Sequence, residues 1–299
     1  MRSGRRLHRW FTTGGVFLSL ISPLFAAGDP AYPAAINKWR NQREERLKTD
    51  NGWLTVAGLF WLTQGDNTAG SGADNSIVLP AGSCPARIGT FRFDGGKTIF
   101  VAERGVAVTS DGKHVTTIEM KPDTSGSPQI ISFGNLSMSV IERGKRFGVR
   151  LRDKNSEFRR KFTGLNWYPV NEAYRDVARF VPYNPPRRVS IPNVLGDTEE
   201  HTSPGYAVFK LKGKRCRLEP ISEGGRLWFI FRDLTSVKET YQAGRFLYAD
   251  PPKDGKVVLN FNQAYNPPCS FTPYATCPLP PRQNRLKVRI PAGEKRYHH

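Results

Sequence analysis

The sequence predicts an all-β, mainly antiparallel protein with one short N-terminal helix. Its 299 residues include 28 glycines and 23 prolines, many of them between short β-like runs. This composition indicates many turns and argues against a helical bundle. The apolar runs recur at near-regular intervals, as in a β-sandwich. A hydrophobic content of 38% is enough to build a core, which excludes a wholly disordered chain.

Residues 1–27 have the pattern of an export signal. Four arginines precede the apolar stretch Val16–Phe25, and Ala26 and Ala27 offer small residues to a signal peptidase. The apolar stretch is shorter than the roughly 20 residues that a spanning helix needs, so cleavage is favoured over a retained anchor. We therefore expect a periplasmic or secreted protein with no membrane span once the signal is removed.

The chain is strongly basic. It has 45 lysines and arginines against 26 acidic residues, a formal net charge of +19. Such a charge attracts anions. The basic residues are scattered, however, and the densest cluster, 159–161, lacks the interleaved aromatics of a nucleic-acid signature. We expect no specific nucleic-acid partner, while binding of envelope polyanions stays open as an alternative function.

Four cysteines fit an exported protein, and four cysteines allow three pairings. Cys269 and Cys277 enclose seven residues, so a local disulfide is easy to close, and Cys84 would then pair with Cys216. The spacing is not C-x-x-C, and histidines are scarce, so no metal site is expected. No P-loop or dinucleotide motif occurs either, so no cofactor is predicted.

Four segments are expected along the chain. They are the signal 1–27, a helical segment 28–50, a β-sandwich-like subdomain 51–155 and a barrel-like subdomain 156–299 that carries a proline-rich cysteine loop. The helix is expected over 33–48, because Pro33 suits a first turn and Asn51-Gly52 ends the pattern. One stripe of this helix carries Ile36, Trp39, Arg43 and Leu47.

Short strands separated by turn residues are expected between 53 and 153. Turns are predicted at Gly65-Asp66-Asn67, Asp94-Gly95-Gly96 and Asp111-Gly112-Lys113. The stretch from Leu62 to Gly70, followed by Asn75-Ser76-Ile77-Val78-Leu79, resembles forkhead-associated domains. The phosphothreonine-reading arginine and the Ser-x-x-His of that family do not occur here. The resemblance therefore implies a sandwich fold and not phosphopeptide binding.

The proline-rich stretch 156–204 is expected to be a loop-rich junction with one strand at 187–191. A second β region follows. Its expected strands are 206–211, 216–219, 227–232, 241–249, 257–262 and 286–290.

One arginine in this β region carries the main site hypothesis. Arg245 lies among apolar neighbours, where an unpaired charge is costly. One interpretation is structural: Arg245 pairs with Asp233, Glu239 or Asp250. The other is a pocket for a small polar or anionic ligand. Its walls would be formed by Arg245, Asn260, Asn262, Tyr265, Asn284 and Arg285 beneath the Cys269–Cys277 loop.

Within this pocket hypothesis, Asn260 and Asn262 are expected on one face of a strand, about 6.6 Å apart. A hydrolase that uses Asp233 or Glu239 as its acid is an alternative, because paired carboxylates can serve hydrolysis. Whether the protein is an enzyme stays open.

The block Ala264–Leu286, AYNPPCSFTPYATCPLPPRQNRL, resembles the signature of domain-of-unknown-function family 1684. Supporting matches lie at 53–62, 238–247 and 292–295. The resemblance implies no activity, since none is assigned to the family. Members typically have Asp where this chain has Asn260, and an amide cannot carry out a proton transfer that a carboxyl would.

Overall fold

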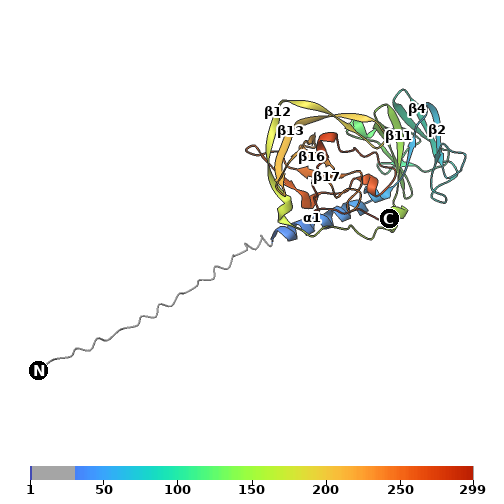
Figure 1. Ribbon diagram of the computed structural model, residues 1–299. Coiled ribbons are helices and arrows are strands. Elements are labelled where there is room, and N and C mark those ends of the chain that lie inside the picture. Colours follow the sequence, from blue (N-terminus) through green and yellow to red (C-terminus); the bar gives the residue numbers. More distant parts are fainter. Residues whose placement is uncertain (2–30, 299) are drawn as a thin grey trace.

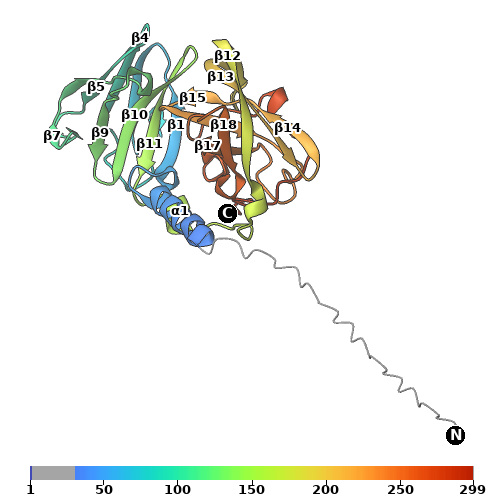
Figure 2. The same cartoon turned by 90° about the vertical axis from the view of Figure 1, so that its left-hand side faces the viewer.

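The protein is described from a computed structural model, which covers Met1 and residues 31–298. Apart from Met1, the predicted signal lies outside these described residues. The strands form mainly antiparallel sheets in two β-rich halves, and one long helix, α1 (Ala31–Lys48), runs along the base of both (Figures 1 and 2). The predicted fold class is confirmed. None of the described helices is long and apolar enough to cross a membrane.

The helix α1 agrees with the expected segment 33–48. Pro33 lies in its first turn, where a missing N–H costs no hydrogen bond. Ile36 and Leu47 are buried. The chain then turns at Gly52, where a Cβ would lie 2.1 Å from the carbonyl oxygen of Leu47, so only glycine fits.

The N-terminal half is a sandwich of two sheets. A six-stranded sheet has the order β1-β11-β10-β9-β6-β7, and a five-stranded sheet has the order β3-β2-β4-β5-β8, in which β2 and β3 are parallel. The strands are β1 (Val56–Trp61), β2 (Gly65–Gly70), β3 (Ile77–Val78), β4 (Gly89–Asp94), β5 (Lys97–Ala102), β6 (Thr109–Ser110), β7 (Lys113–His114), β8 (Thr117–Glu119), β9 (Ile130–Phe133), β10 (Leu136–Arg143) and β11 (Arg146–Asp153).

The sandwich core lies between these sheets. Phe91 and Phe100 enter it from the five-stranded sheet, and Val149 and Leu151 enter it from β11. Because side chains alternate along a strand, Arg150 projects from the opposite face of the six-stranded sheet. Arg150 is nevertheless buried. This outer face therefore packs against other parts of the protein.

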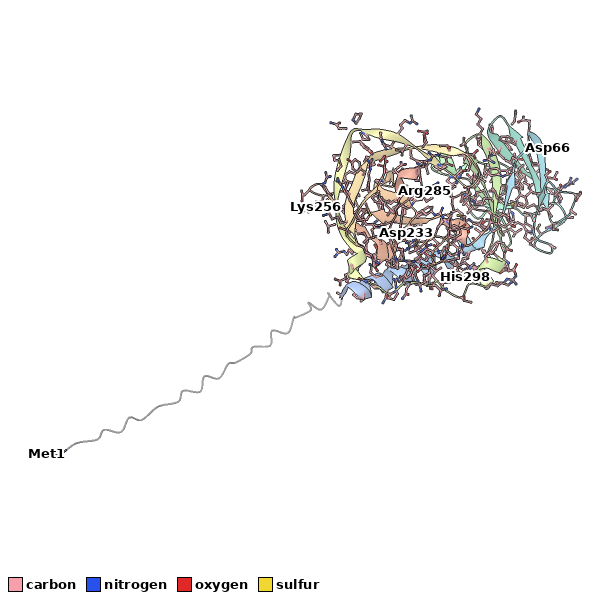
Figure 3. The ribbon with its side chains drawn as sticks, viewed as in Figure 1. Met1, Asp66, Asp233, Lys256, Arg285 and His298 are labelled. Carbon is pink, nitrogen blue, oxygen red and sulfur yellow. The ribbon has the colours of Figure 1, made fainter. Side chains whose placement is uncertain are left out.

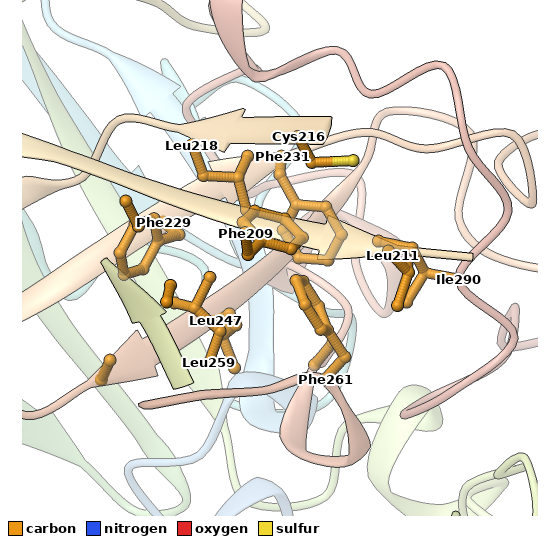
Figure 4. Close-up of a cluster of buried hydrophobic side chains, with 14 of the residues drawn as sticks. Phe209, Leu211, Cys216, Leu218, Phe229, Phe231, Leu247, Leu259, Phe261 and Ile290 are labelled. Atoms are coloured by element: carbon orange, nitrogen blue, oxygen red, sulfur yellow. The ribbon is translucent and has the colours of Figure 1, made fainter. Parts of the chain in front are cut away.

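The C-terminal half has a four-stranded sheet, β14-β13-β12-β18, and a three-stranded sheet, β15-β16-β17. The strands are β12 (Arg175–Pro192), β13 (Thr198–Leu211), β14 (Lys214–Leu218), β15 (Ile221–Glu223), β16 (Arg226–Phe231), β17 (Arg245–Ala249) and β18 (Lys256–Asn260). The sheets enclose a core that includes Phe209, Leu247, Leu259 and Phe261 (Figure 4). The barrel-like arrangement thus consists of two sheets around one core.

The expectation of a loop-rich junction over 156–204 is wrong from residue 175 onward. Residues 175–192 form one long strand, β12, which pairs with β13 in a hairpin that arches over the top of the molecule in Figure 1. The register shifts between Pro182 and Arg187, and Pro185 and Pro186 lie in this irregularity. Prolines have no N–H for a ladder and are tolerated at such bulges, so they did not interrupt the strand.

Three expected strands, 241–249, 257–262 and 286–290, differ from the structure. β17 begins only at Arg245, and the segment expected to continue to Asn262 leaves the sheet after Asn260 and forms the 3₁₀ turn Phe261–Gln263. Residues 286–290 form no named strand, although Leu286 N donates to the carbonyl of Arg232. Other short helices are α2 (Glu157–Arg160) and the 3₁₀ turns Trp53–Thr55, Asp123–Ser125, Glu172–Tyr174, Pro268–Ser270 and Arg282–Asn284.

Candidate functional site

A cavity of about 370 Å³ lies where α1, the sandwich and the C-terminal half meet. Its lining comes from all three parts: Arg43 and Leu47 of α1, Arg143 of β10, and Trp228 and Tyr248 of β16 and β17 are examples. Further lining residues are Trp53, Glu223, Phe246, Tyr265, Asn266, Pro268, Phe271, Thr276, Cys277 and Pro278. The site exists only when the three parts are packed together.

Three flat rings form one wall of this cavity. Trp228 and Tyr248 are register partners on β16 and β17, and their rings stack with centroids 5.9 Å apart and 11° between planes. Tyr248 and Tyr265 continue the stack at 6.3 Å and 13°. Tyr265 is held in place by a two-way backbone pairing with Phe246, at 2.8 and 2.9 Å. The three stacked rings form an aromatic wall against which a flat apolar group can pack.

Arg43 reaches this wall from α1. Its guanidinium lies over the Tyr265 ring, 4.4 Å from the centroid, a cation–π distance. Nε is 2.7 Å from Oε2 of Glu294, and Nη2 donates to the carbonyl of Asn266 at 2.9 Å. Glu294 is fully buried. Burial raises the pKa of the Glu294 carboxyl, although the charge of Arg43 opposes that rise.

A second hollow of about 600 Å³ adjoins the first and shares five of its residues, including Arg43, Trp53 and Tyr248. We call the two together the junction cavity. The second hollow adds Arg46 and Arg226 and has no acidic residue in its lining. The whole junction cavity is thus lined by four arginines and one carboxylate.

That carboxylate is Glu223, and it accepts a hydrogen bond from the hydroxyl of Tyr248 at 2.7 Å. At the inner end, Arg143 donates from Nε to Oγ1 of Thr276 at 2.9 Å and pairs through Nη2 with Asp123 at 2.8 Å. Three of the four lining arginines are neutralised by carboxylates outside the lining, because Arg43 pairs with Glu294, Arg143 with Asp123 and Arg226 with Asp250 at 3.0 Å. Arg46 is the lining arginine that forms no ion pair with a described residue, and its charge favours anions.

The six residues of the sequence-based site are not brought together. Arg245 is 1% exposed, and its Nη2 donates to Asp233 at 3.1 Å and to the carbonyl of Ile290 at 3.0 Å. Its Nη1 donates to the carbonyl of Ala292. This is the structural pairing that the sequence left open, with Asp233 as the partner. Figure 3 shows Asp233 inside the C-terminal half.

Asn260 and Asn262 do lie near each other, with Nδ2 of Asn262 3.4 Å from Oδ1 of Asn260. Their other partners are structural: the Tyr32 hydroxyl donates to Asn260 at 2.8 Å, and Nδ2 of Asn262 donates to the carbonyl of Asn171 at 2.8 Å. The two amides therefore tie α1 and the segment before β12 to the end of β18.

The other three residues of the sequence-based site, Asn284, Arg285 and Tyr265, lie in different surroundings from one another. Asn284 is buried and bonds the backbone of Glu219 in both directions, at 2.8 Å each. Arg285 is exposed, and its Nε contacts the carbonyl of Pro280 at 3.4 Å. Of the six predicted residues, Tyr265 is the one that lines the junction cavity.

The two acids considered for hydrolysis are both occupied. Asp233 accepts from Arg245 and from the backbone N–H of Ile290 at 2.7 Å. Glu239 accepts from the Tyr168 hydroxyl at 2.9 Å and pairs with Arg289 at 2.7 Å. Burial raises the pKa of Glu239, but these two hydrogen bonds outweigh it and lower the pKa overall. Neither carboxyl lines the junction cavity.

All four cysteines are free thiols. The expected pair Cys84–Cys216 is not formed, because Cys84 packs against the sandwich core and Cys216 lies in the C-terminal core. Cys269 and Cys277 are neighbours that hydrogen-bond through their thiols, although no disulfide joins them. This contact lowers the pKa of Cys269 and raises that of Cys277. Within the described part of the chain, no three His, Cys, Asp or Glu residues are grouped for a metal ion.

The sequence carries local signals of the junction cavity. Arg43 falls on the inward stripe of the predicted helix, and Arg150 lies between apolar residues of a predicted strand, as Arg245 does. Trp53, Trp228 and Tyr248 looked like ordinary core residues. Only the packing of three distant segments distinguishes them from the core.

Residues 160–295 match the model of a family described as protein of unknown function, DUF1684. The resemblance inferred from the sequence is confirmed over that segment, which spans most of the C-terminal half. Arg43, Trp53 and Arg143 of the junction cavity lie before it. No curated protein matches the chain.

Among solved structures, the chain is similar to the solution NMR structure of an uncharacterized protein of Haloarcula marismortui. Identity is 29% and the TM-score is 0.39, over 46% of this chain and 78% of that one. It is also similar to an FHA domain solved in a study of phosphothreonine-dependent interactions, with 17% identity and a TM-score of 0.23 over 31% of this chain and 92% of that one. At these TM-scores neither likeness supports a statement about function.

Proposed function

We propose that this protein binds a small polar or anionic ligand with a flat ring in the junction cavity. One observation carries the proposal: a cavity walled by three stacked rings is lined by arginines, of which Arg46 forms no ion pair with a described residue, and its single lining carboxylate is already bonded to a tyrosine. Pockets that combine an apolar wall with a few placed polar groups are the usual form of small-molecule sites.

The two kinds of lining suit two parts of one ligand. Aromatic side chains such as Tyr248 and Tyr265 attract flat groups through dispersion and burial of apolar area. Guanidinium groups attract carboxylate and phosphate oxygens. A ring that carries an acidic substituent would engage both.

Mass spectrometry of the protein isolated natively tests this proposal. We expect a co-purifying compound that is retained by wild type and lost by Tyr248→Ala. The matched control is Tyr206→Ala, because Tyr206 also lies under an arginine, Arg217, at 3.7 Å, but outside the junction cavity. The control is expected to retain the compound.

Two results would contradict the proposal. One is a wild-type protein that carries no compound. The other is equal loss from both tyrosine variants. Bound material that both variants keep at low salt and release at moderate salt would instead indicate a polyanion held by the basic surface, because exposed charge contacts are screened.

We also propose that the chain is exported and cleaved after residue 27, on the strength of its basic, apolar and small-residue pattern. In an oxidising compartment the neighbouring thiols of Cys269 and Cys277 would then form a disulfide. The mass of the protein recovered from the exported fraction tests the cleavage. A full-length chain found only inside the cell would contradict it.

A further inference from the structure

One buried arginine behind the wall of the junction cavity lacks the partners that buried charges normally have. Arg150 projects from the outer face of β11, between Val149 and Leu151, whose side chains enter the sandwich core. It is 7% exposed. Its Nε and Nη2 have no hydrogen-bond partner, and its guanidinium forms no ion pair with any described residue.

The charge of Arg150 thus has no directly bonded counterion: the carboxylate that acts on it from nearby, Asp123, is already paired with Arg143. Burial lowers its pKa to about 10, and the nearby positive charge of Arg143 adds to the shift. The side chain therefore stays charged at neutral pH. A buried charge without a partner is strongly destabilising, and buried N–H groups that make no hydrogen bond add to that cost.

The two arginines beside it are satisfied. Arg143 is paired with Asp123 and bonded to Thr276. Arg152, two residues further along the same face of β11, donates from Nη1 to the carbonyl of Gly52 at 2.6 Å and to Oγ1 of Thr55 at 3.1 Å. The missing partner is therefore a property of Arg150 and not of the whole sheet face.

Arg150 is not itself a lining residue of the junction cavity, but it lies directly behind one that is. Its guanidinium lies 5.1 Å from the centroid of the Trp53 ring, which lines both hollows. It also interacts electrostatically with Arg143 and with the thiol of Cys277, two further lining residues. An anionic group that enters past Trp53 would meet these unpartnered N–H groups.

We propose that Arg150 is the anion subsite of the junction cavity and binds a carboxylate or phosphate oxygen of the ligand through Nε and Nη2. This inference rests on the proposed function and names the chemistry that the ligand must have. Nε and one Nη form the fork that binds two oxygens of an oxyanion at once. The ring of the ligand would then lie toward Tyr248 and Tyr265.

Calorimetric titration with phenyl phosphate, benzoate and the neutral phenol tests the assignment. Wild type should bind the two anions at least about tenfold more tightly than phenol, as expected for hydrogen bonds to a charged group. Arg150→Met should remove that preference and leave phenol binding unchanged. Because the variant loses an unpaired charge, its melting temperature without ligand should equal or exceed that of wild type.

Arg152→Met is the matched control, since it removes the same charge from the same strand face. It should keep the preference for anions and lower the melting temperature. Arg150→Lys keeps the charge without the fork and should give an intermediate preference, which tests the assignment even if Arg150→Met folds poorly.

The outcomes separate this inference from the proposed function. An anion preference that survives in Arg150→Met, or that is lost equally in Arg152→Met, would overturn the subsite and leave the cavity as the binding site. Failure of wild type to bind any of the three compounds would overturn both. A preference for phenyl phosphate over benzoate, or the reverse, identifies which oxyanion the subsite takes.

Discussion

Arg245 and Arg150 are two buried arginines on strands, each between apolar neighbours, and they differ in what faces them. Arg245 meets the carboxylate of Asp233 and two backbone carbonyls. Arg150 meets the face of Trp53, the charge of Arg143 and a thiol, and the Asp123 carboxylate that acts on it is paired with Arg143 instead. The first is a structural ion pair in which one N–H, that of Nε, makes no hydrogen bond, whereas the second has no ion pair and two unbonded nitrogens, which an added anion would satisfy. A buried charge points to function when its partner is missing, and not simply because it is buried.

The largest change in stability that tests this comparison is expected for a substitution at Arg245. Arg245→Met leaves Asp233 buried without its partner, so the free energy of unfolding should fall by about 3–5 kcal/mol. Urea denaturation measures this loss. Arg92→Met, which breaks the exposed pair with Asp66 on the sandwich, should change it by about 0–1 kcal/mol. Similar losses of unfolding free energy in both variants would mean that the Arg245–Asp233 pair does not stabilise the fold as a buried ion pair should.

Glu294 provides a second buried charge for the comparison, paired with Arg43 at the cavity wall. Burial raises its pKa in the folded protein, with Arg43 opposing. A raised carboxyl pKa means that folding favours the protonated form, so this contribution to stability is full below the ordinary glutamate value of about 4.3 and is lost as pH rises through the folded pKa.

Glu294→Gln should therefore remove the pH-dependent contribution of this carboxyl to the free energy of unfolding. The stability of wild type relative to this variant should decrease as pH rises from about 4 toward neutrality. Unfolding at several pH values measures the difference. A difference that stays constant, or that grows with pH, would contradict the assignment of a raised pKa.

Closing the Cys269–Cys277 disulfide tests the region next to Arg150. The loop encloses seven residues, so oxidation should stabilise the protein by about 2–3 kcal/mol on the chain-entropy account. Denaturation of oxidised and reduced protein measures this, and Cys277→Ser should abolish the difference. Cys84 and Cys216 lie in separate cores and should remain alkylatable after unfolding. Loss of all four thiols on mild oxidation would contradict this.

The smallest effect is expected at the amides of the sequence-based site. Tyr32→Phe removes the hydroxyl that bonds Asn260 and Asn262, and should cost about 1 kcal/mol of stability. It should leave binding in the junction cavity unchanged, because the hydroxyl lies outside that lining. A weaker affinity for phenyl phosphate in this variant would argue for a site near the amides instead.

Much of the fold follows from local sequence. The helix over 33–48, the short strands of the sandwich and the turns at Gly95 and Gly112 all depend on neighbours in the chain. The turn expected at 65–67 is wrong, because these residues pair with β4 as part of β2. The long strand β12 did not follow, because Pro185 and Pro186 argue locally against a strand and are accommodated only by a bulge opposite β13. The strand limit at Asn260 did not follow either, because the chain there turns where Asn260 and Asn262 bond Tyr32 and Asn171, which are distant in sequence.

The site was harder to predict because its parts are far apart in sequence. Arg245 and Arg150 look alike locally, and nothing near either residue states whether a carboxylate will face it. Asp233 reaches Arg245 from the segment after β16, whereas the outer face of β11 receives Trp53 and the cysteine loop. Tertiary packing alone separates the satisfied arginine from the unsatisfied one.

The most direct measurement is a crystal structure of the protein with 4-bromophenyl phosphate, in which the anomalous signal of bromine fixes the orientation of the compound. We expect the bromophenyl ring beside Tyr248 and Tyr265 and the phosphate oxygens within hydrogen-bond distance of Nε and Nη2 of Arg150. A compound bound elsewhere, or seated in the cavity with its phosphate turned away from Arg150, would contradict this account.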